Sequence, residues 1–88
     1  MPAYDLIVRP SAYKAFASLD PVVRRRVAAA MDALREDPRP HGATRLPGAD
    51  DVWRIRVGAY RVVYAIEDGR LLILVLRIGP RGSVYRGM

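Results

Sequence analysis

The sequence of 88 residues contains no cysteine. Without thiols the chain can form neither a disulfide framework nor a thiolate zinc site, and it needs no oxidising compartment. The first residues lack the apolar stretch of a signal peptide, and no segment approaches the length of a membrane span. We therefore expect a cytoplasmic protein. A chain of this length can build one core, so residues 1–88 are expected to form a single domain.

Histidine is almost as scarce, because His41 is the only one. It lies in a polar stretch, and the sequence around it holds no cluster of metal ligands. A lone histidine in such a loop is usually a surface residue, so we expect neither a metal site nor catalysis at His41.

Positive charge is present in excess, with 15 lysine and arginine residues against 9 acidic residues and a net charge of +6. All but one of the basic residues are arginine. Guanidinium groups bind phosphate oxygens bidentately and stay charged at any working pH, so an acidic partner or a nucleic acid is expected. A GC-rich genome is an equally good explanation for the preference of arginine over lysine, but it does not explain the net charge.

The pattern of apolar residues predicts a strand, two helices and then three strands. Val23, Val27 and Met31 recur at helical spacing after Asp20 and Pro21, which are typical of a helix start. The expected elements are a strand at residues 4–9, helices at 11–19 and 21–36, a loop at 37–50, and strands at 52–57, 60–67 and 70–78. This order predicts an α+β fold in which a helical hairpin packs on one face of a twisted, mostly antiparallel sheet.

Three arginines lie in the hairpin formed by the strands at 52–57 and 60–67. If Gly58 and Ala59 are the whole turn, Arg56 lies directly opposite Arg61, and Arg54 lies on the same outer side of the sheet. Like charges at opposed positions destabilise a strand pair, so this arrangement favours a site for an anion, which would bridge the guanidinium groups. The alternatives are that an acidic side chain pairs with one arginine or that the turn is longer.

The last strand is apolar on both faces. A two-residue turn at Asp68 and Gly69 places Leu71, Ile73 and Val75 on the core side. The residues expected on the outer side, beside Arg61, are Leu72, Leu74 and Leu76. An exposed row of leucines usually marks a binding surface, although a loop or the C-terminal segment could also cover it.

Beyond the last strand, a turn shaped by Gly79, Pro80 and Gly82 carries Arg81, and Tyr85 follows. A basic residue and an aromatic ring close together suit a splayed nucleotide, because one binds its phosphate and the other stacks on its base. Tyr85 could equally anchor the end of the chain on the core.

Two segments, RLPGADDVWRIRVGAYRVVYAI and LVLRIGPRGSVYR, resemble the RelE toxins of the RelE/ParE superfamily. The resemblance implies a RelE-like fold and a toxin of a type II toxin–antitoxin pair. Such a toxin enters the ribosomal A site and cuts the messenger RNA there by attack of a ribose 2′-hydroxyl on the adjacent phosphate, without a metal or other cofactor. By position, the catalytic set carried over from the family comprises Arg54, Arg56, Arg61, Arg81 and Tyr85, and the four arginines also contact RNA.

The sequence departs from the family at positions that matter for proton transfer. Some members have lysine where this chain has Arg54 and Arg56, and many have histidine or lysine at the position of Pro80. Arginine is a poor general base near neutrality, so the general acid and base stay open. Tyr85 is one candidate for orienting the 2′-hydroxyl, and the ribosomal RNA could contribute groups that no toxin sequence shows.

The resemblance also implies partners and alternatives. A cognate antitoxin, acidic and partly disordered when free, is expected to fold a segment onto Leu72, Leu74 and Leu76. The toxin alone is expected to be a monomer, and the toxin with its antitoxin a higher-order complex. One alternative function is that of the ParE branch, which has the same fold and poisons DNA gyrase. Another is a small basic RNA-binding module without catalysis.

Overall fold

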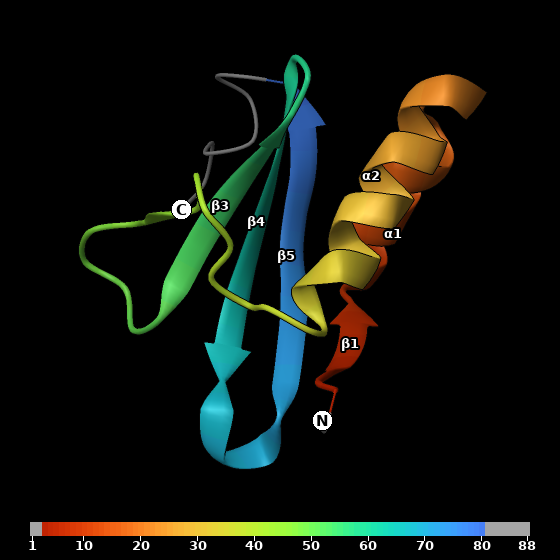
Figure 1. Cartoon of the computed structure of the whole chain (residues 1–88). Helices are drawn as coiled ribbons and strands as arrows, with labels where there is room; N and C mark the ends of the chain where they lie inside the picture. The colour runs from red at the N-terminus through yellow and green to blue at the C-terminus, as the bar shows by residue number, and fades with distance from the viewer. Residues whose placement is uncertain (1–2, 81–88) are drawn as a thin grey trace.

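A mixed sheet with two helices on one face forms the molecule, and the computed structural model describes residues 3–80 (Figure 1). The elements in chain order are β1 (Asp5–Val8), α1 (Pro10–Ala17), α2 (Pro21–Leu34), β2 (Thr44–Arg45), β3 (Val52–Val57), β4 (Tyr60–Glu67), the 3-10 turn η1 (Asp68–Arg70) and β5 (Leu72–Pro80). In this part of the chain neither helix has the length and apolar character needed to cross a membrane. The predicted α+β order is confirmed, with β2 as a strand that the sequence did not predict.

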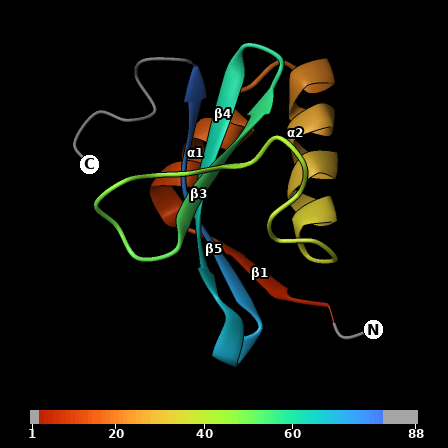
Figure 2. The ribbon, with the colours of Figure 1, turned by 60° about the vertical axis from the view of Figure 1, so that its left-hand side comes forward.

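The sheet has 5 strands in the order β1-β5-β4-β3-β2. β1 runs parallel to β5, and the other neighbours are antiparallel. The two helices connect β1 to the rest of the sheet and lie together on one side of it, as the two views show (Figures 1 and 2). The opposite side, which we call the outer face, is free of helices.

Both helices begin at a proline, whose fixed backbone angle suits the first helical position. Asp20 is the N-cap of α2 as predicted, but its side chain makes no capping hydrogen bond. Its carbonyl instead accepts the first intrahelical bond, from the backbone N–H of Arg24 at 2.7 Å. The predicted apolar face of α2 is confirmed, because Val27, Met31 and Leu34 are buried in the core.

The β3–β4 hairpin has the predicted register. Val57 pairs with Tyr60, so the turn contains only Gly58 and Ala59. Gly58 has a φ of +61°, which a glycine adopts at no steric cost. The core side of the hairpin carries Ile55, Val62 and the fully buried Tyr64.

The β4–β5 connection differs from the prediction of a two-residue turn. Asp68–Arg70 forms a short 3-10 turn, and Leu71 adopts a left-handed conformation with φ 48° before the strand begins at Leu72. Leu71 was expected on the core side and is instead 39% exposed in the turn. The pairing of β5 with β4 is therefore shifted by two residues from the predicted register. Because side chains alternate along a strand, a shift of two keeps Ile73 and Val75 facing the core.

A bulge further along β5 changes which residues face the core. The register slips between Val63 and Tyr64, so Tyr64 pairs with Val75 while Val63 pairs with Arg77. Because β5 has one extra residue at this bulge, the side chains beyond it that face the core are those that would otherwise face outward. Ile78 therefore faces the core opposite Val62, and the strand continues to Pro80 instead of ending at Ile78.

Candidate nucleic-acid interface

Three arginines of the hairpin gather on the outer face. Arg56 lies directly opposite Arg61, and Arg54 lies opposite Val63 on the same side. Within residues 3–80 no carboxylate forms an ion pair with any of the three. The register and the absence of acidic partners in this part of the chain exclude both alternative explanations for the arginine pair, and a cluster of unneutralised guanidinium groups suits an anion.

The three arginines differ in exposure. Arg56 is exposed and Arg54 is half-buried, but Arg61 is only 6% exposed. Arg61 therefore lies on the predicted outer side of the hairpin but is buried there. Its Nη1 donates to the carbonyl of Tyr60 at 3.4 Å, a long hydrogen bond that uses one of the five guanidinium donors. A buried cation is costly unless it is paired, so an anion that reached Arg61 would be bound strongly.

The other two residues of the expected catalytic set, Arg81 and Tyr85, lie outside the described residues. Their placement stays a prediction. The last described residues lie beside the turn of the β3–β4 hairpin, because Gly79 pairs with Arg61 and Pro80 pairs with Tyr60.

The outward leucines of β5 are less exposed than expected. Leu72 is 9% exposed, and Leu74 and Leu76 are half-buried. Leu76 packs against a small cluster on the outer face that includes Leu46 and Ala49 of the loop before β3. Leu76 and this loop therefore pack against the same two buried residues, Val52 and Val63. Beside Leu74, Ile7 of β1 adds exposed apolar surface, because it pairs with Leu74 and is 52% exposed.

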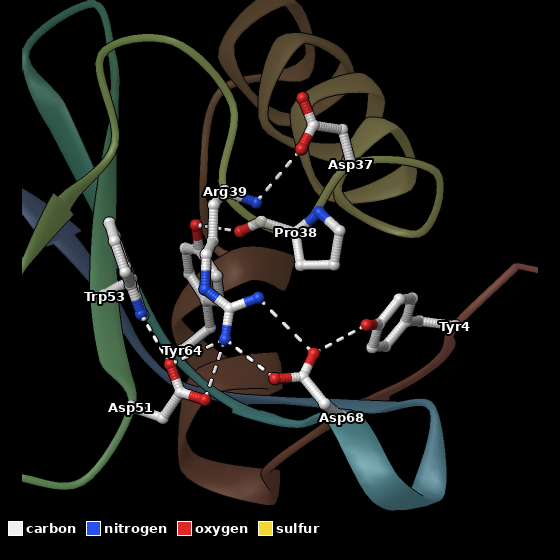
Figure 3. A network of polar contacts seen from close by, with 8 residues as sticks. All are labelled: Tyr4, Asp37, Pro38, Arg39, Asp51, Trp53, Tyr64 and Asp68. Carbon is white, nitrogen blue, oxygen red and sulfur yellow. Dashed lines mark hydrogen bonds and ion pairs between the residues drawn. The ribbon is translucent and has the colours of Figure 1, made fainter.

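Arg39 is the centre of a polar cluster that the sequence did not indicate (Figure 3). Its Nη2 donates to both carboxylate oxygens of Asp51 at 2.9 and 2.8 Å and to Oδ2 of Asp68 at 2.9 Å. The guanidinium lies 5.6 Å from the ring centroid of Trp53, whose indole N–H donates to Asp51 at 2.8 Å. The hydroxyl of Tyr4 donates to Asp68 at 2.6 Å. Two carboxylates neutralise Arg39, so this cluster is not an anion site.

The pKa values in this cluster follow from its bonds. The indole N–H of Trp53 and the guanidinium of Arg39 lower the pKa of Asp51, and Arg39 and Tyr4 lower the pKa of Asp68. The carboxylate of Asp68 in turn raises the pKa of Tyr4. These bonds connect the loop after α2, the residue before β3, the β4–β5 turn and the residue before β1, so the cluster holds the loop against the sheet.

Tyr64 makes the second attachment of that loop. Its side chain is fully buried in the core, and its hydroxyl donates to the carbonyl of Pro38 at 2.7 Å. Burial raises the pKa of Tyr64 to about 12. The loop is thus attached at two consecutive residues, Pro38 and Arg39, just before His41.

His41 lies on a hollow at the edge of the sheet, together with Arg54 and Arg56. Among the described residues there is no group of three or more side chains able to hold a metal ion. The structure therefore brings His41 close to the arginine cluster, an association that its position in a polar loop did not suggest.

Comparison with known proteins finds relatives along nearly the whole chain. Residues 6–85 match the family model described as the ParE toxin of the type II toxin–antitoxin system parDE. The sequence is similar to that of a candidate RelE1 toxin of Methanocaldococcus jannaschii, with 24% identity over 86 residues that cover 94% of this chain and 96% of that protein.

The fold is similar to solved structures of RelE toxins bound to their antitoxins. A chain of the archaeal RelE–RelB complex from Pyrococcus horikoshii OT3 has a TM-score of 0.81 and 30% identity, with 91% of this chain and 97% of that chain covered. A chain of the intact RelBE toxin–antitoxin complex of E. coli has a TM-score of 0.80 and 28% identity, with 89% of this chain and 96% of that chain covered.

Proposed function

Since the chain belongs to the RelE/ParE toxin family of type II toxin–antitoxin systems, and is RelE-like in structure, we propose that it is a ribosome-dependent endoribonuclease that cuts messenger RNA in the A site. Such a target places its action in the cytoplasm. The observation that carries the proposal is the outer-face cluster of Arg54, Arg56 and Arg61, which has no carboxylate partner among residues 3–80.

The proposed reaction uses the RNA as its own nucleophile. The 2′-oxygen forms a bond to the adjacent phosphorus while the bond from phosphorus to the 5′-oxygen breaks. The 2′-hydroxyl loses its proton and the leaving 5′-oxygen gains one, so the products are a 2′,3′-cyclic phosphate and a 5′-hydroxyl. The arginines act by charge and position, because guanidinium keeps its proton at neutral pH. They stabilise the charge that develops on the phosphate and hold the attacking and leaving oxygens in line.

Arg81 and Tyr85 complete the proposed site. Arg81 is assigned a second contact to the phosphate, and Tyr85 is assigned the orientation of the 2′-hydroxyl. Both assignments come from the family resemblance alone, because Arg81 and Tyr85 lie outside the described residues.

The test is cleavage of a defined message on ribosomes, followed by mapping of the new 5′ ends. The wild-type protein should give cuts within the A-site codon. Arg56→Ala and Arg81→Ala should reduce cleavage at least a hundredfold with an unchanged circular dichroism spectrum, because Arg56 is exposed and its removal leaves the core intact. The matched control is Arg25→Ala, an exposed arginine of α2, which should cleave normally.

The ParE branch supplies a second candidate function, which the matching family model favours by its name. A gyrase poison would inhibit supercoiling of plasmid DNA and leave the message intact on the ribosome. Intact message together with inhibited gyrase would replace the proposed function by this one. Binding to ribosomes without either activity would favour the non-catalytic RNA-binding module.

We further propose a cognate antitoxin as partner, since the similar solved structures are toxin–antitoxin complexes. Its segment would cover Leu72, Leu74 and Leu76 together with the neighbouring Ile7, and its acidic residues would neutralise the arginines. Leu74→Glu should weaken antitoxin binding at least tenfold, and Val22→Glu on the exposed side of α2 should not. Equal affinities of the two variants would exclude this surface.

A further inference from the structure

A hollow of about 510 Å³ lies at the edge of the sheet, and we call it the edge hollow. It is formed by α2, by the loop that leads into β2, and by β3. Figure 2 shows this loop crossing between α2 and β3. The lining residues are Ala30, Ala33, Pro40, His41, Gly42, Thr44, Arg54, Ile55 and Arg56.

The walls of the edge hollow suit a nucleobase. Ala30, Ala33 and Ile55 provide apolar surface for the face of a base, while His41 and Thr44 provide hydrogen-bonding groups for its edge. Its volume is within the range of small-molecule sites. No acidic residue is among the described residues that line it, so nothing on its wall repels a phosphate.

The charge around the edge hollow continues the arginine cluster of the outer face. Successive residues of a strand point to opposite faces, so β3 directs Ile55 toward the helices and Arg54 and Arg56 toward the outer face. Both arginines are also among the residues that line the edge hollow. A nucleic-acid strand that passes over this edge would leave the outer face and enter the hollow without losing contact with the same two guanidinium groups.

A third arginine lies beside the turn that follows β3. Arg26 is one helical turn before Ala30 on α2, and its Nη1 lies 3.6 Å from where a Cβ on Gly58 would stand. Gly58 follows β3 directly, two residues after Arg56. Within residues 3–80 none of Arg26, Arg54 and Arg56 forms an ion pair, so all three charges are available to phosphates.

We propose that the edge hollow is a nucleotide subsite that holds one unstacked base of single-stranded RNA beside the cleaved phosphate. In this subsite Arg54 and Arg56 bind the phosphate between the held nucleotide and the outer-face site, Arg26 binds the next phosphate, and the imidazole of His41 hydrogen-bonds the edge of the base. The choice of RNA rests on the proposed function, while the position and chemistry of the subsite rest on the hollow itself.

Ala33→Trp is the variant that tests the subsite, because Ala33 is exposed and an indole at this position would fill the hollow without entering the core. The control is Ala29→Trp, an exposed alanine of the same helix that does not line the hollow. The probe is a fluorescent ten-nucleotide single-stranded RNA, with binding followed by anisotropy. Stacking of one base contributes about 1–3 kcal/mol, so Ala33→Trp should weaken binding roughly tenfold or more and Ala29→Trp less than twofold.

A second probe distinguishes base binding from charge. When the missing base is the one that enters the hollow, an RNA with one abasic position should bind the wild-type protein more weakly than the intact RNA does. The abasic RNA should bind Ala33→Trp no more weakly than the intact RNA does. His41→Ala should also weaken binding of the intact RNA, as Ala33→Trp does. Arg26→Ala should lower the slope of log affinity against log salt by about 0.7, as expected for one lost phosphate contact.

The outcomes separate the subsite from the proposed function. If Ala33→Trp and Ala29→Trp bind RNA equally well, or if the wild-type protein does not bind the probe at all, the subsite is wrong even when ribosome-bound message is cut. If Ala33→Trp loses binding as expected but the wild-type protein leaves the message intact, the subsite stands and the proposed cleavage is wrong.

Discussion

Removing the hydroxyl of Tyr64 should destabilise the protein by an amount that depends on pH. In Tyr64→Phe the carbonyl of Pro38 loses the hydrogen bond that it accepts at 2.7 Å from the only side chain bonded to it among residues 3–80. A buried polar group left without its partner costs about 1–3 kcal/mol. Pro38 is half-buried and its hydrogen bond to Tyr64 is partly buried, so water replaces part of the lost bond, and we expect a cost of about 1–2 kcal/mol at pH 7.

The same substitution removes a titrating group. Tyrosine titrates near pH 10 in the unfolded chain, and burial raises the pKa of Tyr64 to about 12 in the folded protein. A raised pKa of this kind contributes stability that is complete below pH 10 and is lost as the pH rises toward 12, because the unfolded chain releases its proton first. At pH 11 the wild-type protein should have lost about 1.4 kcal/mol from this source, whereas Tyr64→Phe loses nothing from it.

The measurement is the free energy of unfolding in urea for both proteins at pH 7 and pH 11. Other groups titrate in both proteins and cancel in the difference. The wild-type advantage of about 1–2 kcal/mol at pH 7 should therefore shrink to nearly zero at pH 11. Tyr13→Phe is the matched control, because Tyr13 is 59% exposed, and it should match the wild-type protein at both pH values. A difference between wild type and Tyr64→Phe that stays constant with pH would falsify the link between burial and the raised pKa.

Three further predictions concern the loop, a turn and the ribosome. Arg39→Met should destabilise the protein at pH 7 and make its urea midpoint depend less on pH below about pH 4. The reason is that Asp51 and Asp68 have lowered pKa values, which contribute stability above about pH 4 that is lost as the pH falls further. If the urea midpoint of the variant fell with acid as steeply as that of the wild-type protein, the role of Arg39 would be contradicted. Leu71→Asn should raise the free energy of unfolding by about 0.5–1 kcal/mol, because a left-handed leucine is strained and asparagine tolerates this conformation; the control Arg70→Asn should give no gain. Binding of the protein to ribosomes should weaken steeply as salt is raised, since several guanidinium groups displace counterions from phosphates, and salt-independent binding would indicate an apolar docking surface instead.

Local signals in the sequence were sufficient for the helices and the hairpin. Pro21 after Asp20, and apolar residues at helical spacing through Leu34, predicted α2 to within two residues of its end. The two-residue turn at Gly58 and Ala59 predicted the register in which Arg56 lies opposite Arg61. These features depend on residues close together in the chain, and periodicity expresses such local geometry directly.

Local sequence signals did not predict the β2 strand or the length of the β4–β5 turn. Thr44 and Arg45 have no strand pattern of their own, and they form a strand because they pair with Arg54 and Trp53 of β3. Asp68 and Gly69 were expected to form a tight turn, but the carboxylate of Asp68 is bonded to Arg39 and Tyr4, and the turn extends to Leu71. Contacts with distant segments therefore decided both features.

The sequence by itself determined which face of the sheet carries the arginines, because a strand alternates its side chains and the hairpin turn leaves one register. It did not determine how deeply each arginine is buried or what lies beside it. Arg61 is buried, Arg39 is neutralised by aspartates 12 and 29 residues away, and His41 lines a hollow with Arg54 and Arg56. Burial and ion pairing depend on which distant segments meet, and only the tertiary packing of the loop between α2 and β3 decides that.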